Sequence, residues 1–294
     1  MSVSRLVDSL RHPPKETRPS FAGRTIVITG ANTGLGYEAA LKFVQLDAKR
    51  VILACRSVQK GEDARVKIEA ATTRKSVVDV WELDMLSYNG IQAFANRTKT
   101  ELDRLDIVVL NAGVVMATYQ VSDYGWEKTL QINVLSTSLL AMLLLPKLQA
   151  SKTAEYTPVL ELVSSEMHVG VSKLKQPEAK GQGPLHAYNE PEGYFMATQY
   201  AVSKLFLEYA KAALVQLAGG SSADPNVLVV SVCPGPTKSD LARDSKEWYM
   251  RAALWVFSTL VQHSTEVGAR IYISGATLGR EGHGGFWRSN QLQP

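Results

Sequence analysis

The sequence predicts an α/β protein in which a doubly wound parallel sheet carries helices on both faces within a single domain. Short runs rich in β-branched residues alternate with helical patterns along the chain, which is typical of this class. Most of the short runs are almost continuously apolar, as strands buried on both faces of a parallel sheet should be. A chain of 294 residues with 45% hydrophobic residues can bury a full core. No stretch rich in Gly, Ser or Pro divides it into two domains.

Six strands and five helices follow from these patterns. The strands are expected at residues 25–29, 51–54, 77–83, 107–110, 159–163 and 227–232. The helices are expected at residues 34–46, 59–71, 88–102, 123–149 and 198–217. One long irregular segment, residues 166–196, remains, and loops of that length in a compact domain are usually functional or disordered.

The charge pattern argues against a nucleic-acid partner. The formal charge of +4 comes from 32 basic and 28 acidic residues spread along the chain, without a basic stripe. The two cysteines, Cys55 and Cys233, each stand in an apolar run and not in a metal-ligand or disulfide spacing. We expect neither a metal site nor a disulfide, and a reduced, cytoplasmic setting.

Targeting and membrane signals are weak. Residues 1–22 mix charge and proline and lack the apolar core of a signal peptide, so we expect an extension lying over a domain that spans residues 23–294. The apolar stretches 139–145 and 252–261 are shorter than the roughly 20 residues of a membrane span. We expect no integral span, while the second stretch leaves peripheral membrane contact open.

The first strand runs into "TGANTGLGYEAALKF", where Gly30, Gly34 and Gly36 lead into a helix. Glycines at such a turn let the backbone approach a pyrophosphate, which the exposed N–H groups at the helix start then bind. Three glycines could also serve only a tight turn. The spacing G-x-x-x-G-x-G differs from the commoner G-x-G-x-x-G fingerprint and indicates a particular family.

Five further motifs follow in a fixed order. They are Asn111-Ala112-Gly113 after the fourth strand, Asn133 in "LQINVL", Ser165 in "LVSSEMH", the Tyr200-x-x-x-Lys204 pair and Pro234-Gly235 after the sixth strand. Together with the glycine turn they resemble the short-chain dehydrogenase/reductase family over roughly residues 22–280. The resemblance is to its carbonyl-reductase and retinol-dehydrogenase-like branches, and it implies a Rossmann-type fold.

The resemblance also implies a set of nucleotide-binding residues. The predicted contacts are Gly30, Asn32, Thr33, Gly34, Leu35, Gly36, Arg56, Asp84, Met85, Asn111, Ala112, Gly113, Tyr200, Lys204, Pro234, Gly235, Thr237 and Ser239. In this reading Asp84 and the Met85 N–H bind the adenine edge, unless Asp84 serves only the start of the next helix. The residue beside the nicotinamide amide is Ser239 or Thr237, and both stay open.

The end of the second strand predicts the cofactor type. An NAD-preferring fold places an acid there, against the ribose 2′-hydroxyl. This sequence reads "VILACRSVQKG", with Arg56, Ser57 and Lys60 where the acid would stand. A guanidinium fork suits a 2′-phosphate, so we expect NADP(H), although Arg56 could be an ordinary surface arginine.

Tyr200 and Lys204 form the predicted catalytic pair. Residues at i and i+4 share one helix face, so the ammonium should lower the pKa of the phenol from its reference value near 10 toward neutrality. Such a phenol can exchange a proton with a carbonyl or alcohol oxygen. The resemblance implies that Ser165, and not Ser164, hydrogen-bonds the substrate oxygen. It also implies that Lys204 binds the nicotinamide ribose and that Asn133 supports a proton-relaying water.

Two segments are expected to shape the substrate site. The insert at residues 173–195 should overhang it, and Tyr188, Tyr194, Phe195, Met167 and Met196 either line an apolar pocket or pack the insert onto the body. The aromatic segment 241–262 stands at the family's lid position, and it equally suits a membrane-surface helix or a subunit contact.

The sequence therefore predicts an NADPH-dependent reductase of ketones or aldehydes in a medium to large apolar small molecule, such as a specialised metabolite. Two alternatives remain: a nucleotide-binding scaffold with little turnover, and a membrane-surface lipid or retinoid oxidoreductase. A homodimer through the helices at 123–149 and 198–217 is open, as is a monomer.

Overall fold

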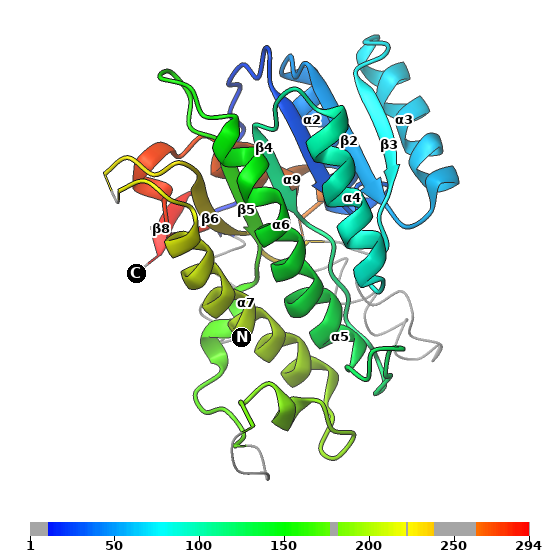
Figure 1. The fold of residues 1–294 in the computed structure, drawn as a ribbon, viewed down its shortest axis with the longest axis vertical. Helices are drawn as coiled ribbons and strands as arrows, with labels where there is room; N and C mark the ends of the chain where they lie inside the picture. Colours follow the sequence, from blue (N-terminus) through cyan, green and yellow to red (C-terminus); the bar gives the residue numbers. More distant parts are fainter. Residues whose placement is uncertain (1–10, 177–181, 222, 238–262, 294) are drawn as a thin grey trace.

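A central sheet with strand order β3-β2-β1-β4-β5-β6-β7-β8 organises the protein (Figure 1). The computed structural model describes residues 11–176, 182–221, 223–237 and 263–293. The parallel strands are β1 (Thr25–Thr29), β2 (Arg50–Cys55), β3 (Val78–Glu82), β4 (Ile107–Leu110), β5 (Val159–Val163), β6 (Leu228–Cys233) and β7 (Phe286–Arg288). The short strand β8 (Gln291–Gln293) pairs antiparallel with β7. The strand order reverses direction between β1 and β4, and such switch points hold the ligands of this architecture.

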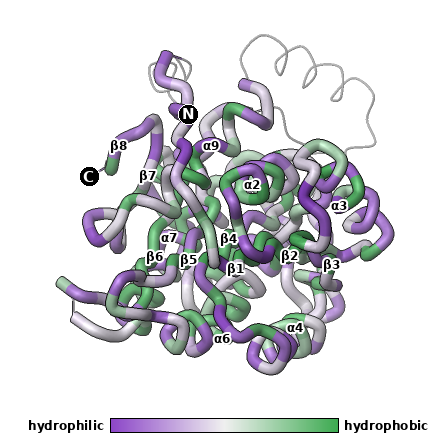
Figure 2. Tube along the Cα trace, turned by 90° about the horizontal axis from the view of Figure 1, so that it is seen from above, coloured by the Kyte–Doolittle hydropathy of each residue, from purple (hydrophilic) through white to green (hydrophobic). Residues whose placement is uncertain are grey.

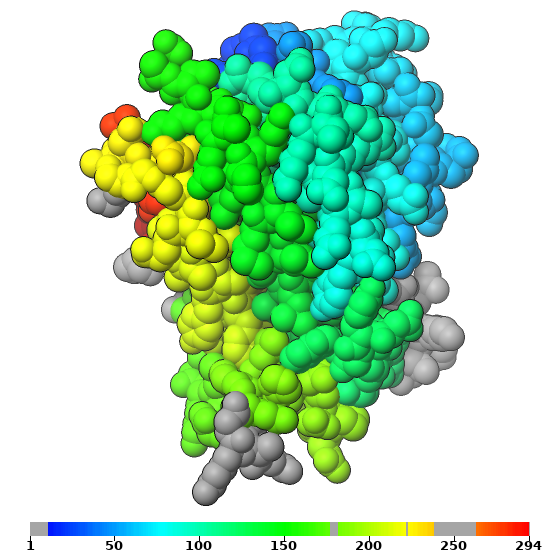
Figure 3. Space-filling view, viewed as in Figure 1, coloured from blue at the N-terminus to red at the C-terminus, as the bar shows by residue number. Residues whose placement is uncertain are grey.

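Helices cover both faces of the sheet, as predicted. One face carries α2 (Gly34–Gln45), α3 (Val58–Thr72) and α9 (Thr265–Gly275), and the other carries α4 (Tyr88–Glu101), α6 (Thr137–Ala150) and α7 (Met196–Leu217). Figure 2 shows α2 and α9 above the line of strands and α4 and α6 below it. In Figure 3, seen from the same side as Figure 1, α4, α6 and α7 lie side by side across the middle of the visible face. This arrangement confirms the predicted doubly wound α/β fold.

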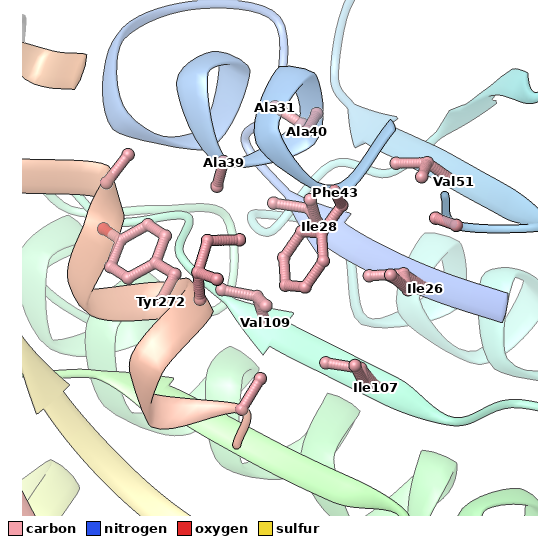
Figure 4. Packing of buried hydrophobic residues seen from close by; sticks show 14 of the residues in the cluster. Ile26, Ile28, Ala31, Ala39, Ala40, Phe43, Val51, Ile107, Val109 and Tyr272 are labelled. Carbon is pink, nitrogen blue, oxygen red and sulfur yellow. The ribbon is translucent and has the colours of Figure 1, made fainter. Parts of the chain in front are cut away.

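The alternation of side chains along each strand divides the core in two. In β1, Ile26 and Ile28 pack toward α2 and α9, whereas Val27 between them packs toward α4 and α6. All three are 0% exposed, which explains why the strand reads as one continuous apolar run. Figure 4 shows Phe43 of α2 and Tyr272 of α9 packed over β1 and β4.

The helix predicted at residues 123–149 begins later than expected. A short helix α5 (Lys128–Leu130) leads into a π-helical turn η1 (Gln131–Ser136) and then into α6. The Glu127 side chain sets the start, because its carboxylate accepts hydrogen bonds from the backbone N–H groups of Thr129 and Leu130. The elements α9, β7 and β8 were not predicted. The two strands are only three residues long, and β7 joins the sheet by pairing with the distant β6.

One helical stretch of the described residues, Lys128–Ala150, is long and apolar enough by composition to cross a membrane. Its most apolar window is 67% buried inside the protein, as expected for a core helix. The predicted lid at 241–262 and Ser239 lie outside the described residues, as do residues 1–10 of the extension and 177–181 of the insert.

Candidate active site

A cavity of about 410 Å³ opens at the carboxyl ends of the parallel strands. It brings together segments that follow β1 to β6 and side chains from α7 and α9. The predicted site residues that line it are Gly30, Asn32, Thr33, Gly34, Leu35, Arg56, Asp84, Met85, Asn111, Ala112, Gly113, Ser165, Tyr200, Lys204, Pro234, Gly235 and Thr237. Gly36 and Asn133 do not line the cavity but lie directly behind residues that do.

The glycine turn between β1 and α2 is built around the Asn111 side chain. Gly30 and Gly34 have φ values of +66° and +59°, which favour glycine. A Cβ on Gly36 would lie 2.6 Å from both Asn111 Nδ2 and the Gly30 oxygen, so the close approach requires a glycine. Asn111 Nδ2 donates to the Thr29 oxygen at 2.8 Å and more weakly to the Gly30 oxygen at 3.4 Å.

Tyr272 supports the same turn from α9. Its ring is 0% exposed and borders the cavity, and its hydroxyl donates to Asn111 Oδ1 at 3.0 Å. Figure 4 shows this hydroxyl at the edge of the core formed by α2 and β1. The contact fixes which way the Asn111 amide faces, so that its nitrogen points at the glycine turn.

The segment after β2 presents Arg56 to the cavity. The side chain is exposed, and Ser57 next to it caps α3, accepting a hydrogen bond from the Lys60 N–H at 3.4 Å. After β3, Asp84 Oδ1 accepts from the Leu86 N–H at 3.0 Å, which leaves its other oxygen for a ligand. Asp84 therefore shapes its own turn and still borders the cavity.

Asn133 lies one layer behind the predicted catalytic pair, Tyr200 and Lys204. It exchanges hydrogen bonds of 2.9 Å with the backbone of Val114 in both directions, and its Nδ2 also donates to Ser203 Oγ at 3.1 Å. A Cβ on Gly113 would lie 3.3 Å from Asn133 Oδ1 and 3.8 Å from Lys204 Nζ. The lack of a side chain at Gly113 lets this strand end approach both groups.

Ser165, Tyr200 and Lys204 meet at the base of the cavity. Tyr200 and Lys204 lie on one face of α7, with Lys204 Nζ 5.6 Å from the centroid of the tyrosine ring. Lys204 Nζ donates to the Val163 oxygen at 2.8 Å, which ties it to the end of β5. The Ser165 side chain, two residues further on, hydrogen-bonds the Tyr200 hydroxyl.

The pKa values differ from the sequence-based expectation. Burial raises the pKa of Tyr200 well above its usual value, and the hydrogen bond with Ser165 only partly opposes this effect. Burial lowers the pKa of Lys204 to about 8. The expectation that the pKa of the phenol lies near neutrality was therefore wrong for the protein alone, because the desolvation of Tyr200 is the dominant effect.

The two serines after β5 differ in their contacts. Ser165 Oγ reaches Tyr200 and also accepts from the Met167 N–H at 3.3 Å. Ser164 Oγ is buried, borders the cavity and finds no hydrogen-bond partner within the described part of the chain. This geometry favours Ser165 over Ser164 as the partner of Tyr200.

The described part of the insert mainly packs on the body of the protein. Tyr188 is buried in a small core with Val202 and Phe206, and the Tyr194 hydroxyl donates to the Met116 oxygen at 2.8 Å. Phe195 is 64% exposed. Of the five aromatic and methionine residues predicted to line a pocket or to pack, Met167 alone borders the cavity that the described residues enclose.

Comparisons with known proteins indicate the family of this chain. A family model for the short chain dehydrogenase matches residues 24–169. The short-chain dehydrogenase/reductase phmF of Phaeosphaeria nodorum is 39% identical over 97% of this chain and 83% of that protein. The short-chain dehydrogenase/reductase ffsI of Aspergillus flavipes is 40% identical over 99% of this chain and 84% of that protein.

The chain belongs to the short-chain dehydrogenase/reductase family. The protein is accordingly an oxidoreductase that uses a nicotinamide cofactor and acts on a small molecule. The structure of RhlG from Pseudomonas aeruginosa, an NADP active-site complex, shares the fold, with a TM-score of 0.66 over 91% of this chain and 94% of that chain at 24% identity.

Several residues that line the cavity of this protein were not predicted from the sequence. Tyr272, Glu166 and the two buried thiols Cys55 and Cys233 all line the cavity. Tyr272 lies 161 positions from Asn111, and no local pattern marks it. The cysteines could have been found, because each stands at the carboxyl end of an expected buried strand.

Proposed function

We propose that the protein is an NADPH-dependent reductase that converts a ketone or aldehyde of a medium to large apolar small molecule into the alcohol, reversibly. The observation that carries this proposal is the convergence of Ser165, Tyr200 and Lys204 on the cavity that the glycine turn and Arg56 also border. Apolar side chains of Val114, Met167 and Val163 share that cavity and suit an apolar substrate.

The residues of the turn fit a dinucleotide. Gly34 borders the cavity, and a Cβ there would meet no atom within 4 Å, so the absence of a side chain keeps space open above the start of α2. That helix has no acidic residue in its first turn, so its N–H groups and dipole favour a pyrophosphate. Asp84, Met85 and Asn111 border the part of the site where an adenosine would lie.

The end of β2 supports NADP(H) over NAD(H). Arg56 is exposed at the cavity, and the first turn of α3 beside it contains no acidic residue. A guanidinium and a helix N-terminus together favour a 2′-phosphate and leave no carboxylate for a ribose 2′-hydroxyl. The related fold of RhlG, described in complex with NADP, agrees with this choice.

The catalytic residues divide the reaction between them. When bound, the reduced nicotinamide supplies a hydride to the carbonyl carbon. Ser165 and Tyr200 hold the carbonyl oxygen, and Tyr200 donates its phenolic proton as that oxygen becomes an alcohol. The raised pKa of Tyr200 keeps that proton in place until the oxygen becomes basic. Lys204 keeps a positive charge beside the phenolate that remains, and Asn133 holds the Val114 strand end against them.

Fluorescence titration of the protein with NADPH and NADH tests the cofactor assignment without a substrate. NADPH should bind more tightly, and Arg56→Ala should weaken NADPH binding about tenfold to 100-fold while leaving NADH binding unchanged, because one charge-assisted contact is worth about 1.5–3 kcal/mol. Arg65→Ala, in the helix α3 that follows Arg56 and paired with Glu62, is the matched control. Equal loss for both nucleotides would contradict a phosphate contact.

Substitution of the proton donor tests the reaction. Tyr200→Phe should lower NADPH oxidation by apolar ketones and aldehydes about 100-fold to 10,000-fold, the usual contribution of a general acid, without changing the affinity for NADPH. Tyr209→Phe, on an exposed part of the same helix, should behave as wild type. If the wild type binds NADPH but reduces no carbonyl compound, the scaffold alternative holds instead.

A further inference from the structure

The strand β7 lies against the turn that carries Ser165. It pairs with the carboxyl end of β6, Ser231–Cys233, and its first and last residues, Phe286 and Arg288, lie two positions apart. Alternate residues of a strand point to the same side, so both side chains reach the same neighbour. That neighbour is the 3-10 turn η2 (Glu166–Gly170), which directly follows Ser165.

Arg288 forms a buried ion pair with this turn. Its Nε lies 2.8 Å from Glu166 Oε2, and the two side chains are 8% and 4% exposed. Glu166 is the residue directly after Ser165, and its backbone N–H donates to Cys233 Sγ at 3.4 Å. A buried pair of this kind tolerates little movement, because each charge loses its compensation if the other shifts away.

Phe286 makes the second contact, through His168. The two rings meet edge to face with centroids 4.9 Å apart at 74°. His168 Nδ1 lies 2.6 Å from the backbone oxygen of Ser165, and the His168 N–H donates to the same oxygen at 3.2 Å. The ring of His168 is thus held between β7 and the serine itself.

The far end of the hairpin is also fixed. Ser289 and Asn290 connect β7 to β8 with φ values of +50° and +62°. The Asn290 side chain accepts from the Lys15 N–H at 2.8 Å and donates to the Pro13 oxygen at 3.0 Å. The segment before β1 therefore fixes the turn between β7 and β8. The strand β7 in turn contacts the turn after Ser165.

We propose that Arg288 and Phe286 are positioning residues, which fix Ser165 through Glu166 and His168 so that its hydroxyl reaches both Tyr200 and the substrate oxygen. The inference rests on the proposed carbonyl reduction. The turn after Ser165 is a single short 3-10 element whose own hydrogen bonds leave it adaptable. Displacing a group that holds the reacting oxygen by about 1 Å can cost about 100-fold in rate.

Two variants separate positioning from simple stability. Arg288→Met removes the arginine that pairs with the buried Glu166, whereas the double variant Glu166→Met with Arg288→Met replaces both charges by apolar side chains of similar length. The melting temperature should fall in the single variant and largely recover in the double one. In both, kcat should drop about tenfold to 100-fold while NADPH affinity stays within about twofold. Arg288→Lys should recover most of the rate.

Amide hydrogen exchange gives a readout that needs no substrate. The amides of Met167 and His168 should exchange about tenfold faster in both Arg288→Met variants, while the glycine turn at Gly30 stays unchanged. Arg280→Met, an exposed arginine paired with Asp224, is the control and should change neither rate nor exchange. If the double variant recovers full kcat or leaves exchange at the turn unchanged, the inference is overturned. If the wild type reduces no carbonyl compound, the proposed function fails, and the exchange measurement still decides whether β7 fixes the turn.

Discussion

The nucleotide half and the substrate half of the site hold their residues in different ways. Around the glycine turn, positions depend on the absence of side chains. A Cβ on Gly36 would collide with Asn111, and the backbone at Gly30 and Gly34 has a positive φ. Around Ser165, positions are set by side chains from distant segments, such as Arg288 and Phe286 of β7. The first half depends on backbone approach and the second on contacts between separate parts of the chain.

This difference teaches where each half is vulnerable. Where the turn depends on close approach, as at Gly36, an added atom disrupts it, and the damage is local. A turn built on side-chain contacts can be weakened from a distance, by changes in a hairpin or an insert. The two halves should therefore respond to opposite kinds of substitution.

Gly36→Ala should produce the largest effect on nucleotide affinity and should disrupt the nucleotide half alone. The new Cβ would lie 2.6 Å from Asn111 Nδ2, so Asn111 must move and give up its bond to the Thr29 oxygen. We expect NADPH affinity to fall on the order of 100-fold, as for a misplacement of about 1 Å in an active site. Titration of nucleotide fluorescence measures it.

Gly183→Ala in the insert is the matched control. A Cβ there meets no atom within 4 Å, so nucleotide affinity should be unchanged. Near wild-type NADPH binding by Gly36→Ala would show that the turn yields easily and would remove the distinction between the halves.

The same difference explains how much the sequence could predict. The strands, the helices that flank them and the glycine turn follow from local patterns, because burial on both faces and a tight turn leave a mark within a few residues. Most residues that line the cavity were predicted from motifs at the ends of strands. The contacts of Phe286 and Arg288 with the turn after Ser165, the contact of Tyr272 with Asn111 and the docking of the insert could not be predicted, since each joins segments far apart in the chain.

The pKa of Tyr200 was missed for a related reason. The i, i+4 spacing correctly places Lys204 on the same helix face, but spacing says nothing about how deeply β5 and β6 bury both groups. Depth of burial belongs to the tertiary structure, and here it raises the pKa of the phenol and lowers that of the amine.

Lys204→Met should have the next largest effect, on the free energy of unfolding. It measures how much the buried charge in the substrate half destabilises the protein. Burial lowers the folded-state pKa of Lys204 from 10.5 to about 8. Between these values the unfolded chain binds more protons, so the free energy of unfolding of the wild type rises with pH across this window. The charged lysine thus costs on the order of 3 kcal/mol at neutral pH. Its bond to the Val163 oxygen returns about 1 kcal/mol.

The variant should therefore be about 2 kcal/mol more stable than wild type at pH 7 and lose that advantage as the pH approaches 10.5. It should also lose reductase activity. Denaturant unfolding across pH measures the difference, with the exposed Lys67→Met as a control that should stay flat. If the variant is instead less stable than wild type at neutral pH, the contacts of the charged Lys204 outweigh the cost of its burial.

Tyr194→Phe should have the smallest effect and sharpens the role of the insert. The Tyr194 hydroxyl donates to the Met116 oxygen at 2.8 Å, and burial raises its pKa to about 12, so it remains a donor at any ordinary pH. Its loss leaves a carbonyl unpaired and should cost about 1 kcal/mol of unfolding free energy. Because Tyr194 packs the insert and does not border the cavity, kcat/KM should stay within about twofold, well below the effects typical of a residue in the reaction.

Phe195→Ala, which removes an exposed ring, should change neither quantity. A large rise in KM for Tyr194→Phe at unchanged stability would instead show that the insert forms part of the substrate pocket. The substrate half would then include residues of the insert as well as those that line the cavity.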